Sequence, residues 1–452
     1  MSKVIKLKKG LDISLVGEAL QEKVQQPLQG EYALVPDDFR GVIPKMLVKE
    51  GEAVKVGTPL FFDKYHPEVL FCSPVSGTLA AVVRGAKRKI MKVVVAADAE
   101  QTAEHFEIPD LAVADKAAVT EVLLKAGFWP MIKQRPFGII ADAATTPKAI
   151  FVSGFDSAPL APDMNYVLSD RLDDLQMGFR VLAKLTPGKV HLGLKAGSHG
   201  VLDQIENVEK HWFAGPHPAG NVGVQIHHID PINKGERVWT VDIQQVAMIG
   251  RLFRTGSPDF TKVIAVTGSE VKRPHYMQVI AGAKIEGILP DAALTNATAH
   301  VRRISGNVLT GRAVATDDDF LGYYSNQVTV IPEGDHYELL GWGMPRLNKF
   351  SVSHSYFSWL MPHKKYVLDA NLNGGKRAFV VTGLYDKYLP MDIYPLYLLK
   401  AILAGDIDKM ENLGIYEVIE EDLALCEFVD PSKNDIQAIV RQGIDLMIKE
   451  LN

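Results

Sequence analysis

Cysteine is almost absent from this chain, whose 452 residues include two, Cys72 and Cys426, far apart in the sequence. No Cys-x-x-Cys pair occurs. The ligands of a disulfide framework, of a cysteine-bound zinc ion and of an iron–sulfur cluster are therefore missing. A chain with so little cysteine suits a reducing compartment.

Long hydrophobic runs, an apolar leader and an excess of basic charge are missing as well. No stretch reaches about 18 consecutive apolar residues, and the N-terminal MSKVIKLKKGLDISL has no apolar core, so we expect neither a membrane span nor a signal peptide. The 49 basic and 54 acidic residues give a net charge of −5, which leaves no electrostatic footprint for nucleic acid.

The motifs of nucleotide, metal and hydrolytic sites are not found. There is no Walker-type phosphate loop and no G-x-G-x-x-G after a predicted strand. His227 and His228 are adjacent, and neighbouring side chains point in different directions on a helix or a strand. No Ser-His-Asp or Cys-His set is recognisable. We predict no catalytic residue and no metal site in this chain.

The length predicts about three domains, and residues 42–97 have the pattern of the first. Short runs of Val, Leu, Ile and Phe alternate with glycines at turn spacing, which predicts a compact β barrel or sandwich. The segments VKEGEAVKVGTPL and SPVSGTLAAVVRG resemble the flanks of biotinyl and lipoyl carrier domains, in which a lysine at a hairpin tip bears the cofactor. Lys64 occupies that tip here without the flanking methionines, so we interpret it as a solvated lysine, with a modified lysine as the alternative.

The next part of the chain alternates between helical and strand patterns. Helices are predicted at 115–127 and 172–184, a strand at 189–194, and a strand followed by a helix within 236–256. This alternation predicts a mostly parallel α/β layer, whose ligands bind beyond the carboxyl ends of the strands. The turn Ser153–Ser157 is expected at that edge.

The remaining residues divide into a strand-rich and a helix-rich part. Residues 259–330 read as two strands, a helix-like turn and further strands, which fits a small β-grasp domain. After an aromatic-rich stretch, amphipathic helical segments follow from about residue 390, and we expect them to pack on each other or on a neighbouring subunit.

Two segments have the composition of ligand-binding loops. Phe128–Ile139, FWPMIKQRPFGI, alternates aromatic and cationic side chains between prolines, which suits stacking on a flat, partly polar ring. Gly215–Pro231, GPHPAGNVGVQIHHIDP, offers Asn221 as a helix N-cap whose neighbouring amides could face an anion or a carbonyl oxygen. His217 is a weaker candidate there. The alternative for both segments is an ordinary capped turn.

Eight motifs, in order along nearly the whole chain, carry a family resemblance. They are KLKKGLDISL, SPVSGTL with RGAKR, the RPF at Arg135, GPHPAGN, ISGNVLTGRA, FLGYYSNQV, GWGMPRLNKFSV and EEDLALCEFVDPSK. Together they resemble the NqrA family, a component of the bacterial sodium-translocating NADH:quinone oxidoreductases. That family is similar to the flavin-binding, NADH-oxidising subunit of respiratory complex I and to a cluster-bearing component of a related ferredoxin-linked complex.

The resemblance implies an architecture and a setting. It implies a soluble protein at the cytoplasmic face of the bacterial inner membrane, held there by the partner subunits of a six-subunit, Na⁺-exporting complex. The implied parts are a carrier-like barrel-sandwich in residues 1–100, a Rossmann-like α/β domain in 101–256, a β-grasp (SLBB-like) domain in 257–335, and an aromatic-rich linker with a C-terminal helical domain in 336–452.

The sequence departs from the flavin-binding relatives where their cofactors bind. Their glycine-dense loop G-R-G-G-x-G-F-P corresponds to Lys125–Pro130, which keeps one glycine and places Trp129 where a ring system would approach the backbone. Their C-terminal cluster cysteines are missing. We therefore predict no flavin or iron–sulfur cofactor in this chain, and we place the flavins, iron centres and NADH site on other subunits.

Two hypotheses for its role follow. In the first, the chain binds ubiquinone or menaquinone: an aromatic ring stacks on the headgroup and a cation stabilises the reduced form. The residues predicted to bind the quinone are Phe39, Arg40, Trp129, Lys133, Arg135 and Phe137. In the second, the chain has no ligand site and docks the membrane partners through its exposed apolar segments.

Overall fold

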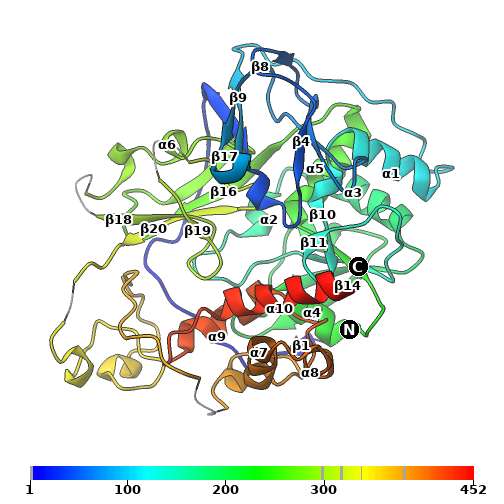
Figure 1. The fold of residues 1–452 in the computed structure, drawn as a ribbon. Coiled ribbons are helices and arrows are strands. Elements are labelled where there is room, and N and C mark those ends of the chain that lie inside the picture. The colour runs from blue at the N-terminus through cyan, green and yellow to red at the C-terminus, as the bar shows by residue number, and fades with distance from the viewer. Residues whose placement is uncertain (1–3, 297–299, 316–318, 337, 380–382, 452) are drawn as a thin grey trace.

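The computed structural model describes residues 4–296, 300–315, 319–336, 338–379 and 383–451. Within them the chain forms four β-sheets, and helices surround the largest sheet (Figure 1). The two smallest sheets lie at the top of Figure 1, and the last helices, α9 and α10, run along the opposite side beneath the large sheet. The protein is thus a mixed α/β structure, as the sequence predicts.

The two smallest sheets form the predicted β barrel-sandwich. One contains β3 (Glu31–Leu34), β9 (Ile90–Ala97), β8 (Gly77–Arg84) and β5 (Ala53–Val54), and the other contains β4 (Pro44–Met46), β6 (Pro59–Asp63) and β7 (Leu70–Cys72). The rings of Phe61 and Phe71 stack in its interior with centroids 4.6 Å apart. Lys64 is exposed in the turn after β6, and its ammonium lies 5.1 Å from the centre of the Tyr65 ring.

The largest sheet has seven strands in the order β1-β14-β13-β12-β15-β10-β11. The first five are parallel, while β10 and β11 are antiparallel to their neighbours. Their bounds are β1 (Val4–Lys6), β10 (Ile132–Arg135), β11 (Ile139–Ile140), β12 (Ile150–Ser153), β13 (Val190–Lys195), β14 (Glu209–Ala214) and β15 (Val238–Val241). This confirms the predicted α/β layer.

Helices cover both faces of the seven-stranded sheet. They are α1 (Lys116–Lys125), α2 (Met164–Val167), α3 (Leu172–Leu185), α4 (Val222–Ile229) and α5 (Ile243–Thr255). Ile150 and Val152 belong to the same core cluster as Leu182 and Ile249 of α3 and α5, whereas Phe151 packs in a separate cluster with α4. Alternate residues of a strand point to opposite faces, so β12 separates these two layers of helices.

A six-stranded sheet forms the third body, in the order β19-β18-β20-β16-β17-β2. Its strands are β2 (Leu20–Gln25), β16 (Thr261–Thr267), β17 (His275–Ile280), β18 (Val301–Ser305), β19 (Arg312–Ala313) and β20 (Gln327–Pro332), and the short helix α6 (Ile285–Ile288) connects β17 to β18. The N-terminal strands β1 and β2 thus join sheets whose other strands lie more than a hundred residues later.

The helices of the C-terminal part gather beside the edge of the large sheet. They are α7 (Pro395–Ala404), α8 (Ile407–Asn412), α9 (Ala424–Val429) and α10 (Ile436–Leu451). Leu398 and Ile444 share a buried cluster with Phe213 of β14 and Val224 of α4. Burial of these apolar side chains ties the C-terminal part to the α/β domain.

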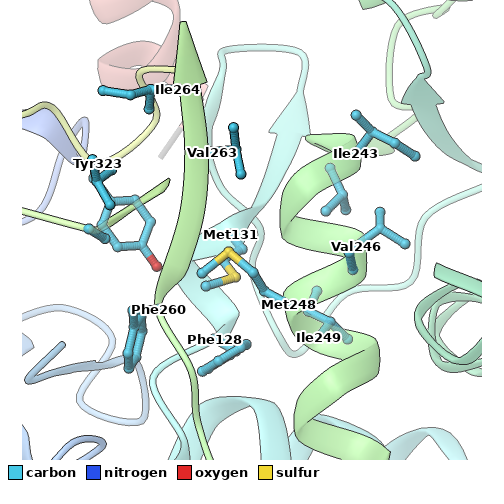
Figure 2. Packing of buried hydrophobic residues seen from close by; sticks show 14 of the residues in the cluster. Phe128, Met131, Ile243, Val246, Met248, Ile249, Phe260, Val263, Ile264 and Tyr323 are labelled. Carbon is cyan, nitrogen blue, oxygen red and sulfur yellow. The ribbon is translucent and has the colours of Figure 1, made fainter. Parts of the chain in front are cut away.

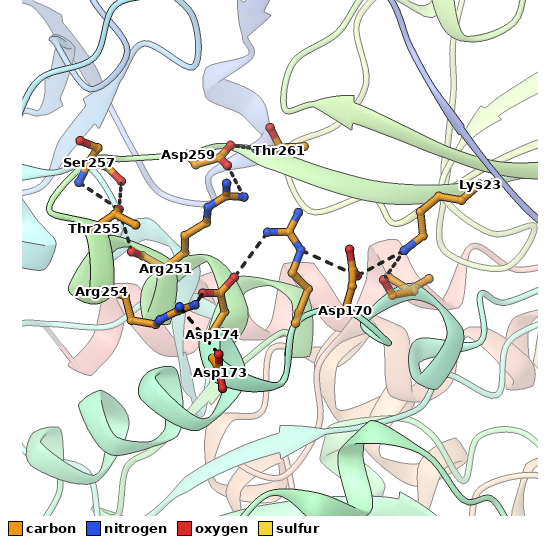
Figure 3. A network of polar contacts seen from close by, with 12 residues as sticks. Lys23, Asp170, Asp173, Asp174, Arg251, Arg254, Thr255, Ser257, Asp259 and Thr261 are labelled. Carbon is orange, nitrogen blue, oxygen red and sulfur yellow. Dashed lines mark hydrogen bonds and ion pairs between the residues drawn. The ribbon is translucent and has the colours of Figure 1, made fainter.

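The three bodies share one continuous hydrophobic core (Figure 2). Phe128 and Met131 lie between α5, represented by Met248 and Ile249, and Phe260 at the start of β16. A chain of ion pairs adds a polar link on the surface (Figure 3), in which Lys23 of β2 contacts Asp170 at 3.4 Å. Arg254 of α5 binds Asp174 of α3 in the same network.

The structure corrects the prediction that Phe128–Ile139 is a loop. Residues 129–131 form a buried 3-10 turn, and Ile132–Arg135 is strand β10, hydrogen-bonded to β15 on one side and β11 on the other. The local sequence suggested a loop because prolines and a glycine flank the segment, but pairing with β15, about a hundred residues away, makes it an interior strand.

Candidate functional site

The order of the parallel strands creates a crevice at the edge of the large sheet. From β12 the chain adds β13 and then β14 on one side, and β15 lies on the other side of β12. The loops that leave β12 and β15 therefore diverge at their carboxyl ends. Such a topological switch point is where open α/β sheets bind ligands.

A cavity of about 440 Å³ occupies this position. Its volume lies within the range of small-molecule sites. The wall draws on the α/β domain, the strand-rich domain and the C-terminal part. It includes Met131, Lys133 and Arg135 at β10, Ser153, Phe155 and Asp156 after β12, His217, Gly220 and Asn221 after β14, Asp242 and Ile243 after β15, Asn307 and Leu309 after β18, Tyr324 and Gln327 near β20, and Ile419 and Glu421.

Two loops of the wall are fastened to each other. Ser153 Oγ donates to the carbonyl oxygens of Phe155 at 2.8 Å and Gly220 at 2.9 Å. Gln225 Nε2 of α4 donates to Ser153 Oγ at 2.8 Å. A Cβ atom on Gly220 would lie 2.5 Å from the nitrogen of Ser157, so only glycine permits this close approach. The site is built on a rigid frame.

Lys133 brings a positive charge into the cavity wall without a carboxylate partner. Its Nζ lies 3.5 Å from the centre of the Tyr324 ring, and the described residues place no acidic oxygen within ion-pair distance of it. Burial lowers the pKa of Lys133, although the more distant Glu421 and Asp242 act to raise it. An ammonium held by a ring face alone keeps donors free for a ligand.

The acidic groups of the cavity are pushed toward their neutral forms. Burial within the protein raises the pKa of Asp156, and the neighbouring Asp242 raises it further. Asp156 is accessible from the cavity itself, and its Oδ1 accepts from the nitrogen of Ala158 at 2.7 Å. Burial also raises the pKa of Asp242. The site can therefore accept a neutral, partly polar ligand at little electrostatic cost.

Arg135 is committed to an ion pair across the sequence. Its Nη1 donates to Asp422 Oδ2 and its Nη2 to Glu421 Oε1, each at 2.6 Å, and the guanidinium side chain is 2% exposed. Asp422 Oδ2 also accepts from the nitrogen of Ile419 at 2.9 Å. Asn221 occupies the N-cap position of α4, but its side chain donates to the carbonyl oxygen of Glu421 instead of capping the helix.

The predicted quinone-binding residues fall into three groups. Lys133 and Arg135 line the cavity. Phe137 is half-buried at its margin, where its ring faces Tyr416 with centroids 6.4 Å apart. Arg40 is largely exposed and pairs with Glu420 at 3.4 Å.

Trp129 and Phe39 belong to the interior. Trp129 is fully buried, donates from Nε1 to the carbonyl oxygen of Ala141 at 2.7 Å, and meets Trp239 edge-on. Phe39 is 2% exposed and packs against Phe71 and two tyrosines. Neither ring has a free face in this structure, which corrects the expectation that a headgroup stacks on Trp129. A Cβ on Gly127 would lie 2.6 Å from Cys72 Sγ, so the backbone there also leaves no room for a flavin ring.

Three site residues had weak or no sequence signals. Phe155 lies in the turn that the sequence places at the sheet edge, and His217 was a minor candidate. Tyr324 had none, because it comes from the strand-rich domain and reaches the cavity only through the packing of the domains.

A first test concerns His217. Burial lowers its pKa from 6.5 to about 4, against a smaller raising effect of the Ser157 main chain. The unfolded chain binds this proton between about pH 6.5 and 4 and the folded chain does not, so this residue makes stability fall as pH decreases through that window, in total by on the order of 3 kcal/mol. Urea unfolding at several pH values should show a shallower acid loss in His217→Gln than in wild type, and an unchanged loss in His199→Gln, whose side chain is 88% exposed. An equal acid loss in all three proteins would contradict the assignment.

The described residues hold no group of three or more His, Cys, Asp or Glu side chains placed for a metal ion. Among the same residues, no helix combines the length and apolarity that crossing a bilayer requires.

Three family models match the chain in order, and they agree with the bodies of the fold. They are described as the NqrA N-terminal barrel-sandwich hybrid domain (residues 5–98), the NqrA second alpha/beta domain (residues 114–258) and the NQRA C-terminal domain (residues 263–316). A barrel-sandwich, an α/β layer with a switch-point cavity and a smaller mixed sheet thus define a multidomain α/β protein of this type.

Full-length relatives agree. NqrA proteins of the Na(+)-translocating NADH-quinone reductase from Neisseria meningitidis serogroup A, Rhodopirellula baltica and Serratia proteamaculans are 38%, 39% and 37% identical to it. Each alignment covers 99% of this chain and 98–100% of the relative. The chain belongs to the NqrA family, whose members are subunits of the Na⁺-translocating NADH-quinone reductase.

Proposed function

We propose that this chain binds the quinone headgroup of the reductase in the switch-point cavity. The observation that carries the proposal is Lys133, an ammonium in the cavity wall with no carboxylate partner among the described residues. A cation in such a place can donate a hydrogen bond to a quinone carbonyl and can stabilise the negative charge that develops on that oxygen during reduction.

The other walls suit a flat, partly polar ring. Phe155 and Tyr324 supply aromatic surface, and the raised pKa values of Asp156 and Asp242 keep negative charge away from the carbonyl oxygens. The ligand is ubiquinone or menaquinone. This chain contributes no flavin or iron centre of its own, and electrons reach the quinone from cofactors and an NADH site on other subunits.

The same proposal places the chain in its assembly. It is one of six subunits of a Na⁺-exporting membrane complex and lies at the cytoplasmic face of the bacterial inner membrane, attached through its partners. The strand order around β12 supports a Rossmann-like α/β domain akin to the flavin subunit of complex I, and the helices after α6 support a helical C-terminal part.

Titration of the isolated chain with a soluble short-chain ubiquinone, followed by calorimetry, tests the proposal. Lys133→Met removes the charge and keeps most of the side-chain stem, and we expect it to weaken binding about tenfold or more, because hydrogen bonds to charged groups contribute about 1.5–3 kcal/mol. Stability should not fall, since the ammonium has no ion-pair partner to lose among the described residues.

Lys125→Met is the matched control, because Lys125 forms an exposed pair with Glu121 on α1. It should bind quinone as wild type does. Equal affinity of Lys133→Met and wild type would contradict the proposed site.

A second candidate function, docking without a ligand site, is favoured by one observation. Residues 339–372 contain no α-helix or strand among those described and expose many large apolar side chains. These are Leu339, Leu340, Met344, Leu347, Phe357, Trp359, Leu360, Val367 and Leu372. Patches of this kind mark interaction surfaces. Absence of any saturable quinone signal from the wild-type chain would support this function over the first.

A further inference from the structure

His217 is fixed in the cavity wall by the N-terminal segment. Its backbone nitrogen donates to Asp12 Oδ1 at 2.9 Å, and its carbonyl oxygen accepts from the nitrogen of Leu11 at 2.8 Å. The residue is 4% exposed and lines the cavity. The ring therefore has one position relative to a ligand in the site.

Ser157 determines which ring nitrogen carries the hydrogen. Its Oγ accepts from the nitrogen of Gly220 at 2.8 Å and lies 3.1 Å from His217 Nδ1. With that acceptor position used, the hydroxyl hydrogen is directed to Nδ1, and among the described residues no other acceptor is placed for it. A neutral imidazole that accepts at Nδ1 carries its hydrogen on Nε2.

Nε2 is then a hydrogen-bond donor without a protein partner among the described residues. Buried polar groups of proteins are nearly always paired, so a donor left free at a cavity wall indicates a ligand acceptor. The close contact between Gly220 and Ser157 holds this arrangement in place before any ligand arrives.

We propose that His217 binds a carbonyl oxygen of the cavity ligand through Nε2–H, and that Ser157 is a positioning residue that fixes the tautomer. This inference rests on the proposed quinone-binding function and adds a specificity to it. Lys133 on β10 and His217 beside the loop after β12 lie on two sides of β15. Two donors on opposite flanks match a ligand with a carbonyl at each end of one ring, as in a para-quinone.

Three variants of the full chain test the inference by calorimetry with the same short-chain ubiquinone. His217→Phe keeps a ring and removes the donor, and we expect about a fivefold to tenfold loss of affinity, the value of one neutral hydrogen bond. His217→Gln keeps an N–H donor and should lose less than His217→Phe. Ser157→Ala frees the tautomer and should fall between wild type and His217→Phe.

Nitrogen NMR of histidine-labelled wild type supplies a readout that a merely structural role would not move. His217 should show a protonated Nε2 and an unprotonated Nδ1 without quinone, and quinone should shift the Nε2 signal more than the Nδ1 signal. A protonated Nδ1, or a ring unaffected by saturating quinone, would overturn the assignment even if a variant failed to fold.

The outcomes separate the two levels of the proposal. Saturable binding by wild type with equal affinity in folded His217→Phe overturns the role of His217 and leaves the quinone site standing. No binding by wild type overturns the proposed function and this inference together.

Discussion

Replacing Arg135 by methionine is expected to lower the free energy of unfolding by about 3–5 kcal/mol. The guanidinium is buried between β10 and the C-terminal part and neutralises Asp422, which is also buried. Methionine fills much of the space but leaves the Asp422 carboxylate without a cation in a poorly solvated place. Urea unfolding at neutral pH measures the effect.

Two further variants identify the cause. Arg40→Met removes an exposed pair with Glu420 and should change stability by no more than about 1 kcal/mol. Replacing both buried partners, in Arg135→Met with Asp422→Leu, should cost less than the sum of the single changes, because no unpaired charge remains. A loss below about 1 kcal/mol in Arg135→Met alone would show that the pair does not hold the C-terminal part in place.

Replacing Trp129 by alanine is expected to destabilise the protein by about 3–5 kcal/mol, the cost of a large cavity in a core, together with loss of its bond to Ala141. Quinone affinity of the folded protein should stay close to wild type, because the ring does not reach the switch-point cavity. Thermal unfolding and the quinone titration, made on the same preparation, measure the two effects.

Trp359→Ala is the control, since Trp359 is 51% exposed and its removal should change stability by less than about 0.5 kcal/mol. If Trp129→Ala instead kept full stability and lost quinone binding, the ring would belong to the ligand site, as the sequence alone suggested.

The sequence predicted the parts of this protein that depend on local patterns. The helical period of Leu172–Leu185 identified α3, and the apolar run before Ser153 identified β12. It also placed the turn at Phe155 at the ligand-binding edge of the sheet. The ordered motifs identified the family, which the full-length relatives confirm.

The roles of aromatic and charged residues were harder to predict, because a side chain's composition does not reveal its partner. Arg135 looked like a ligand cation until Asp422, 287 residues later, was placed against it. The acidic residues 420–422 looked like the first turn of a helix. Trp129 looked like a stacking surface because the flanking prolines suggested a loop.

By itself, the sequence determined the family, the α/β class and most of the elements, since hydrophobic periodicity and turn residues act over a few neighbouring positions. Tertiary structure alone decided which cation is free: β10 directs Arg135 to the C-terminal carboxylates and leaves Lys133 against Tyr324. It also decided that Ser157 and Gly220 meet at His217. These contacts join residues far apart along the chain, and only the packing of whole sheets brings them within hydrogen-bond distance.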